Sequence, residues 1–349
     1  MGKASNLVLF FILSCMVAVA QTTDVVQRTS SQPNRLFVVE NYLYFTEQTS
    51  NKLCKVRLSS YTPTPVDVVN GIHDPSSMAL YGDELYIAIA YDNKISRIDL
   101  SDNSPTLVDA LSDLRLPNGL AIHDHYLYYT ESQAGTISRI DIGNSSYTPE
   151  IVVEGLSFPS SLALNGNDLY VSETEGNRVS KIDISSDLPV PNTVVSELGA
   201  PIGLKIQDDL LYIAVKNENK ISKVDILNGP QVAVDVVSGL NGPTDIAFLG
   251  ENLLITENYG KKISVLGTLV LGSSDLCVEE FSFYPNPSLN YIYAANISTP
   301  MPFTIYGIGG EMVLSGTIYP NRKIDISTLS SGIYIVVSNN TPLGKIIKL

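Results

Sequence analysis

Apolar residues between positions 33 and 266 recur in a fixed order, which repeats every 42 residues without insertion or deletion. Each repeat opens with a proline and carries a leucine ten residues later. The prolines are Pro33, Pro75, Pro117, Pro159, Pro201 and Pro243, and the leucines are Leu43, Leu85, Leu127, Leu169, Leu211 and Leu253. A third column begins a segment that reads Ile-Ser-Arg-Ile-Asp at 95–99 and 137–141. Six copies of one unit predict a closed or stacked array.

Each repeat contains four short runs that are rich in β-branched and aromatic residues. In the third repeat they cover residues 119–122, 127–130, 137–141 and 151–153. Such runs, separated by Gly, Asn, Asp or Pro, predict β-strands joined by tight turns. A 42-residue unit of four strands is typical of a β-propeller blade. The sequence therefore predicts an all-β chain with a six-bladed β-propeller over residues 21–271.

The strand count also predicts how the ring closes. A Val-rich run occurs once before the first proline, at Asp24-Val25-Val26, and the sixth repeat ends soon after its third strand. The outer strand of the sixth blade then comes either from this N-terminal run or from Leu276-Cys277-Val278. We favour the N-terminal run, because sealing the ring removes an open sheet edge.

Two segments of the third repeat resemble known propeller families. Leu-Tyr-Tyr-Thr-Glu-Ser at 127–132 and Pro-Asn-Gly-Leu-Ala at 117–121 are similar to the NHL, YWTD and senescence-marker/gluconolactonase propellers, all of which have six blades. The resemblance extends from Pro33 through the repeats. It is specific for the architecture and poor evidence for activity, because these propellers include lactonases, lyases, receptor modules and scaffolds.

The repeat columns stop before residue 281, and residues 272–280 are predicted to be a linker. Short alternating strands separated by Gly, Pro and Asn then predict a small Ig-like β-sandwich over 281–349. This segment resembles the type A sorting domain of the bacterial type IX secretion system. The residues that carry the resemblance are Tyr284, Pro285, Asn286, Pro287, Gly332, Tyr334, Lys345 and Lys348. The resemblance implies the type IX machinery as partner, and release or attachment at the cell surface.

The first 20 residues have the layout of a secretory signal peptide: a lysine, an apolar run and Ala18-Val19-Ala20 before Gln21. Cys15 leaves a lipoprotein cysteine as an alternative. No later apolar run is long enough to span a bilayer as a helix. The formal net charge of -14, without a basic cluster, argues against nucleic acid as a partner. Whether Cys54 and Cys277 pair is open, although Cys54 occupies a repeat position where the other copies have serine.

Carboxylates that recur in the repeats are expected to belong to the blade framework. Glu47, Glu131, Glu173 and Glu257 close the second run of their repeats. A basic residue follows five positions later in three of them, as Lys52, Arg178 and Lys262. The spacing predicts ion pairs across hairpins rather than catalytic groups.

Function is expected where the repeats differ from one another, on the face formed by the inter-blade loops and the hairpins between the second and third strands. The candidate ligand-binding residues there are His73, Asp74, Tyr91, Asp92, Arg115, Asn118, Lys216, Asn217, Asp245 and Tyr259. Such a mixture of polar and aromatic groups suits either a ligand site or ordinary solvated loops. His123 and His125 are predicted at the opposite face, so the three histidines cannot converge on one metal ion.

The resemblance to the senescence-marker/gluconolactonase family also suggests a metal. Pro117-Asn118-Gly119-Leu120 looks like the family motif whose asparagine helps to bind a divalent cation, here calcium or magnesium, which would polarise a lactone carbonyl. Asp245 offers a carboxylate three blades away. Ser160-Ser161 and Asn34-Arg35 stand where the family has acidic ligands. The sequence therefore favours a secreted, non-enzymatic module that binds an unknown protein or glycan; the alternative is a metal-dependent lactonase or lyase.

Overall fold

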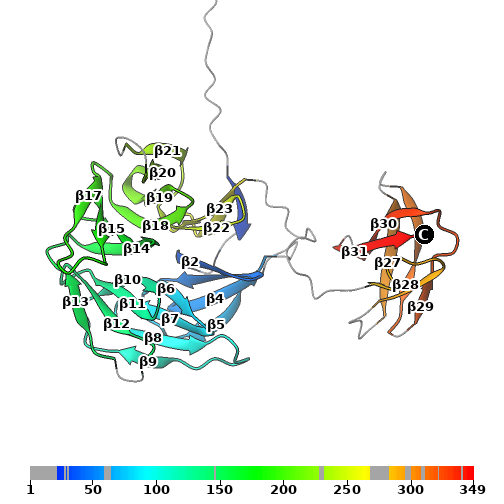
Figure 1. Ribbon diagram of the computed structural model, residues 1–349, viewed down its shortest axis with the longest axis horizontal. Coiled ribbons are helices and arrows are strands. Elements are labelled where there is room, and N and C mark those ends of the chain that lie inside the picture. The colour runs from blue at the N-terminus through cyan, green and yellow to red at the C-terminus, as the bar shows by residue number, and fades with distance from the viewer. Residues whose placement is uncertain are drawn as a thin grey trace, which may run out of the picture.

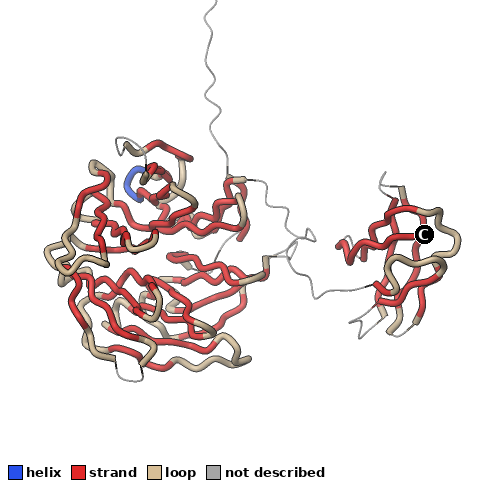
Figure 2. Tube along the Cα trace, in the orientation of Figure 1, coloured by secondary structure: helices blue, strands red, loops and turns tan. Residues whose placement is uncertain are grey.

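The computed structural model describes residues 22–26, 29, 31–58, 64–144, 147–227, 232–267, 283–294, 300–307, 311–320, 322–338 and 341–349. Nearly all of its regular structure is β-strand, and a single 3-10 helix, η1 (Lys216–Glu218), is present in these ranges (Figure 2). The predicted signal peptide and the 272–280 linker lie outside them.

The first five 42-residue repeats each fold into one four-stranded antiparallel sheet, whose strands follow one another in chain order (Figure 1). Blade 1 contains β2 (Pro33–Val39), β3 (Tyr42–Glu47), β4 (Lys52–Arg57) and β5 (Val66–Asn70). Blade 2 contains β6 (Pro75–Tyr81), β7 (Glu84–Ile89), β8 (Lys94–Asp99) and β9 (Val108–Leu111). Blade 3 contains β10 (Pro117–His123), β11 (Tyr126–Glu131), β12 (Thr136–Asp141) and β13 (Glu150–Val153).

Blades 4 and 5 repeat this plan, and blade 6 takes its outer strand from the N-terminus. Blade 4 contains β14 (Pro159–Asn165), β15 (Asp168–Glu173), β16 (Arg178–Asp183) and β17 (Asn192–Val195). Blade 5 contains β18 (Pro201–Gln207), β19 (Leu210–Val215), β20 (Lys220–Asp225) and β21 (Val234–Ser238). Blade 6 contains β22 (Pro243–Leu249), β23 (Asn252–Glu257), β24 (Lys262–Leu266) and β1 (Thr23–Val26). The predicted six-bladed propeller is confirmed.

The N-terminal strand closes the ring, as the strand count predicts. β1 pairs antiparallel with β24, with Thr23 opposite Val265 and Asp24 opposite Ser264. Val25 and Val26 are buried in a core that blades 6 and 1 share. In Figure 1 the blue β1 lies beside the yellow strands of blade 6. The rival segment, 276–278, lies outside the described residues.

Two further sheets form the predicted C-terminal β-sandwich. The three-stranded sheet contains β25 (Phe283–Tyr284), β26 (Tyr291–Ala294) and β29 (Lys323–Asp325). The four-stranded sheet contains β28 (Met312–Ile318), β27 (Met301–Gly307), β30 (Gly332–Ser338) and β31 (Thr341–Lys348). Ile292 from the first sheet and Ile305 and Val336 from the second belong to one buried cluster. Burial of these apolar faces against each other is what holds the two layers together.

The predicted cross-hairpin ion pairs are present in three blades. Lys52 lies 3.5 Å from Glu47, and Lys262 lies 3.3 Å from Glu257. Arg178 binds Glu173 with two hydrogen bonds of 2.7 Å each. These carboxylates are therefore part of the blade framework, as their repetition predicts.

Cys54 also belongs to the framework. It is buried and free, and its Sγ lies 3.5 Å from Asp67 Oδ1. Ser96 and Ser222 make the corresponding contacts with Asp109 and Asp235 in blades 2 and 5. Burial and nearby Glu47 raise the pKa of Cys54 to about 12, so the thiol stays protonated. Cys277, the other cysteine considered for a disulfide, lies outside the described residues.

Candidate functional site

The residue after each repeat proline faces the propeller axis. Every innermost strand has a register irregularity directly after its proline, so the following residues leave the regular ladder. The six side chains at this position line one cavity of about 200 Å³: Asn34, Ser76, Asn118, Ser160, Ile202 and Thr244. Because each blade contributes one of them, this cavity is the mouth of the central channel.

The guanidinium of Arg35 lies inside this ring of residues. Arg35 is only 4% exposed. Its Nη1 donates to the carbonyl oxygen of Thr244 at 2.8 Å, and its Nε donates to the carbonyl oxygen of Ser76. Its Nη2 donates to Asn118 Oδ1 at 3.1 Å and to Ser160 Oγ at 3.4 Å. One side chain of blade 1 thus bonds to blades 2, 3, 4 and 6.

A buried carboxylate accompanies this cation. Burial lowers the pKa of Arg35 from its ordinary value, while Asp245 and Asp74 act in the opposite direction. Asp245 is 4% exposed, and its Oδ2 accepts a 2.9 Å hydrogen bond from the Leu36 N–H. Arginine remains protonated in proteins. The channel mouth therefore holds a fixed positive charge.

One side-chain oxygen of each residue predicted to bind a metal already accepts a hydrogen bond. Asn118 Oδ1 accepts from Arg35, and Asn118 Nδ2 donates to Ser132 Oγ at 3.3 Å. A divalent cation at Asn118 would have to compete with the guanidinium for the same oxygen. Across the described residues, no group of three or more His, Cys, Asp and Glu side chains is arranged to hold a metal. The metal at Asn118 and Asp245 stays a prediction.

A second cavity, of about 560 Å³, lies between blades 1 and 2 on the loop face. Four predicted residues line it: His73 and Asp74 from the inter-blade loop, and Tyr91 and Asp92 from the blade 2 hairpin. Gln32, Gln48, Thr49 and Asn51 complete the lining. Gln48 and Asp74 also line the channel mouth, so the two cavities adjoin.

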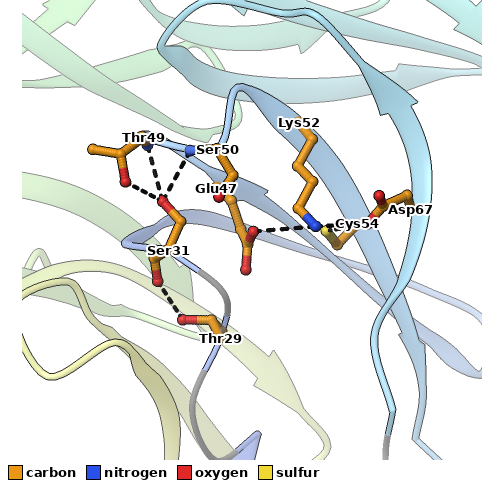
Figure 3. A network of polar contacts seen from close by, with 8 residues as sticks. All are labelled: Thr29, Ser31, Glu47, Thr49, Ser50, Lys52, Cys54 and Asp67. Carbon is orange, nitrogen blue, oxygen red and sulfur yellow. Dashed lines mark hydrogen bonds and ion pairs between the residues drawn. The ribbon is translucent and has the colours of Figure 1, made fainter.

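The blade 1 wall of this second cavity is held by Ser31 (Figure 3). Ser31 Oγ accepts hydrogen bonds of 3.0 Å from the backbone N–H groups of Thr49 and Ser50, and it also contacts Thr49 Oγ1. The Lys52–Glu47 ion pair clamps the base of the same hairpin. The hairpin that presents Gln48, Thr49 and Asn51 is therefore fixed before any ligand arrives.

The blade 2 wall is held by the loop opposite it. His73 Nδ1 and Asp92 Oδ1 are 2.8 Å apart. The N–H groups of Ala90 and Tyr91 donate to the carbonyl oxygens of Asp74 and His73, at 3.1 and 3.3 Å. Tyr91 itself is 77% exposed. The cavity thus carries a free aromatic ring on a rigid hairpin.

Asp74 occupies the junction of the two cavities. Its backbone has a φ of 54°, in the left-handed region. Burial raises the pKa of Asp74, while a hydrogen bond from Gln48 and the charges of Arg35 and Lys216 partly offset that rise. Its Oδ1 is buried without a hydrogen-bond partner in the part of the chain that the structure describes. This carboxyl group can therefore gain a hydrogen bond from a ligand or solvent that reaches it.

The remaining candidates lie apart from the second cavity. Lys216 lines the channel mouth, and its Nζ is 4.9 Å from the ring centroid of Tyr259. The Arg115 N–H donates to Glu131 at 2.9 Å, and the Asn217 N–H donates to Gly199 O at 3.0 Å. Neither Arg115 nor Asn217 lines either cavity.

Sequence reasoning missed Arg35 and the blade 1 hairpin. Arg35 alone is basic in its repeat column, where the other blades have Ser77, Gly119, Ser161, Gly203 and Asp245. Thr49 lies one period before Tyr91. It therefore lies in the same kind of hairpin, between the second and third strands, where function was expected.

The histidines do not converge. His123 ends β10, whereas His73 precedes the start of β6, so the two lie at opposite ends of innermost strands. His125 is 3.9 Å from Asp141, which ends β12 at the same face of the propeller as His123.

Several residues of the predicted sorting motif tie the sandwich together. Asn286 Nδ2 donates to the Lys345 carbonyl oxygen at 2.8 Å, and Asn286 Oδ1 accepts from the Ile347 N–H at 2.7 Å. Tyr334 is buried on β30 and donates to the Ser330 carbonyl oxygen at 2.8 Å. Tyr284 is exposed beside Tyr293, with ring centroids 5.6 Å apart.

Residues 282–348 match the secretion system C-terminal sorting domain. This domain, of the type IX system, implies a secreted or cell-surface protein. No described helix is long and apolar enough to cross a membrane. No curated protein sequence matches the chain.

Solved structures with similar folds include both enzymes and a binding protein. Virginiamycin B lyase from Staphylococcus aureus is 19% identical with a TM-score of 0.52, covering 71% of this chain and 85% of its own. A gluconolactonase from Xanthomonas campestris is 13% identical with a TM-score of 0.59, covering 69% and 87%. An auxiliary nutrient binding protein from Bacteroides ovatus is 13% identical with a TM-score of 0.55, covering 65% and 66%. These similarities show that the chain has a propeller fold, and they do not assign an activity to it.

Proposed function

We propose that this protein is a secreted or cell-surface binding module, whose propeller binds a protein or glycan through its loop face. Residues 1–20 act as the signal peptide for export from the cytoplasm, and the sorting domain directs passage through the outer membrane. The observation that carries the proposal is the pair of adjoining cavities on the face where the repeats differ. Framework bonds fix the walls of the larger one, which favours binding.

Binding is favoured over catalysis by the chemistry of the channel mouth. Arg35 bonds directly to Asn118, so the side chain that would hold a metal holds a guanidinium. Among the described residues, the carboxylates whose charges act on this guanidinium are Asp245, which accepts from the Leu36 N–H, and Asp74. The three histidines are dispersed over both faces.

The proposal is tested by thermal unfolding of the mature chain with a panel of peptides and saccharides. A ligand that binds only the native protein raises the unfolding midpoint by mass action. We expect the rise to be lost in the loop-face variant Asn118→Ala/Lys216→Ala or in variants of the second cavity. The control is His125→Ala at the opposite face. A rise that depends on His125 and survives every loop-face substitution contradicts the proposal.

The alternative is a divalent-metal-dependent lactonase or lyase, favoured by the position of Asn118 at the channel mouth. It predicts that calcium, magnesium, manganese or zinc raises the unfolding midpoint, and that Asn118→Ala abolishes the rise. Lactone hydrolysis that requires the same ion would establish this function instead. Unfolding midpoints that no ion changes would exclude it.

A further inference from the structure

The cavity between blades 1 and 2 is lined by groups that form hydrogen bonds. Its lining consists of three amides, two carboxylates, one hydroxyl, one imidazole and the tyrosine Tyr91. Among the described residues, no aliphatic side chain and no Lys or Arg lines it. A ligand is therefore expected to present several polar groups, and the described lining residues include no Lys or Arg to pair with an anion.

The one apolar surface in this lining is a flat ring. Tyr91 is 77% exposed on a hairpin whose backbone is bonded to the neighbouring loop. An exposed tyrosine ring gives a large contact surface at a small cost in side-chain entropy. The C–H face of a pyranose ring matches such a surface, because it is also flat and apolar.

The polar groups fit hydroxyls better than a cation. Gln48 and Asn51 carry amides that both donate and accept hydrogen bonds, whereas an ammonium group only donates. Of the two carboxylates, Asp92 is paired with His73, and the charge of Asp74 is partly offset by Arg35 and Lys216. The cavity thus has little unpaired negative charge to bind a cation. Gln48 uses one amide N–H on Asp74, and Asn51 Oδ1 accepts from the Asp74 N–H at 3.4 Å. The second N–H of Gln48 and the NH₂ group of Asn51 can donate to ligand oxygens.

We infer that this cavity binds a neutral saccharide, with the Tyr91 ring as stacking platform and Gln48, Asn51 and Asp92 as hydrogen-bonding partners. The inference rests on the proposed loop-face binding function and specifies its ligand class. The volume of about 560 Å³ lies within the range of small-ligand pockets. Ser31 and the His73–Asp92 contact already fix the walls of the cavity. Ligand binding therefore costs little conformational entropy of these walls.

The test is calorimetric titration of the mature chain with neutral hexasaccharides: maltohexaose, cellohexaose, xylohexaose and mannohexaose. At least one is expected to bind. Tyr91→Ala should weaken that binding about tenfold or more, as for an aromatic anchor. Tyr91→Phe, which keeps the ring, and Tyr81→Ala, an exposed tyrosine at the far end of β6, should leave it within about twofold.

The inference is overturned if no hexasaccharide binds the wild type, or if binding survives Tyr91→Ala. Hexalysine serves as the competing probe. Hexalysine binding that Asp92→Asn removes, without saccharide binding, would replace the saccharide by a cationic occupant and leave the proposed function standing. If ligand binding depends on Asn118 and Lys216 but not on Tyr91, the saccharide inference is wrong and the proposed loop-face binding function stands. If no ligand depends on any loop-face residue, the proposed function fails with it.

Discussion

The side chain of Arg35 links one blade to four others through the channel, so its effect reaches the whole ring. Its guanidinium donates hydrogen bonds to the carbonyl oxygens of Ser76 and Thr244. None of the residues at the equivalent position of the other repeats has a side chain as long that ends in a hydrogen-bond donor. The same side chain also orients Asn118, which lines the channel mouth. Arg35 thus connects the stability of the ring to the shape of the candidate site.

Replacement of Arg35 by methionine should lower the free energy of unfolding by about 3 kcal/mol or more, because several buried acceptors lose their donor and buried Asp245 loses a nearby positive charge. Urea unfolding followed by circular dichroism measures the change. Arg35→Met/Asp245→Asn should be less unstable than the sum of the two single variants, because it leaves no unpaired buried charge. Arg115→Met, an exposed control, should change little. An Arg35→Met protein as stable as the wild type would contradict this role.

At the scale of elements, β1 converts an open blade into a closed ring. Val25 and Val26 are buried, and Lys262 Nζ lies 2.8 Å from Asp24 Oδ1. A chain that begins at Thr29 should lose about 3 kcal/mol of stability through the two valines. It should also self-associate, because the edge of β24 becomes available for pairing. Urea unfolding and light scattering check both effects.

Asp24→Asn is the matched control for this deletion, since it removes the ion pair and keeps the strand. A surface pair of this kind contributes less than about 1 kcal/mol. A monomeric truncated chain with wild-type stability would show that β1 is dispensable.

The β15–β16 hairpin predicts a pH dependence. Burial alone would raise the pKa of Glu173, but hydrogen bonds from Arg178, Ser180 and the Ser157 N–H outweigh it and hold the pKa below the ordinary value of a glutamate. A carboxyl group whose pKa falls on folding stabilises the fold above its unfolded-state pKa, and this contribution is lost as the pH falls through the folded-state value. Glu173→Gln should therefore cost about 2 kcal/mol at neutral pH and progressively less below pH 4.5.

Urea unfolding of both proteins at several pH values measures that difference. Glu131→Gln is the control, because Glu131 faces Thr136 instead of a basic residue. A Glu173→Gln deficit that stays constant down to low pH would contradict the assignment.

For the whole molecule, the sequence predicts the architecture well because the architecture is periodic. The proline column marks every innermost strand, and the Asp24–Val26 run identifies the strand that seals the ring. The site is less predictable, because its contacts join residues far apart in the chain. Arg35 meets the Thr244 carbonyl across 209 residues, and no local pattern in the sequence encodes that bond. Asp74 and Tyr91 were predictable because they interrupt the repeat.

The propeller and the sandwich should unfold independently. The sandwich core contains only residues between Phe283 and Ile346, and no hydrophobic cluster of the described residues joins the two parts. Each part therefore has its own cooperative core. Calorimetry of the mature chain should show two transitions, and a chain that ends at residue 267 should keep the propeller transition within about 2 °C. The truncated chain should also retain any ligand that the loop face binds. A single transition, or loss of the ligand on truncation, would show that the sorting domain supports the propeller instead of only exporting it.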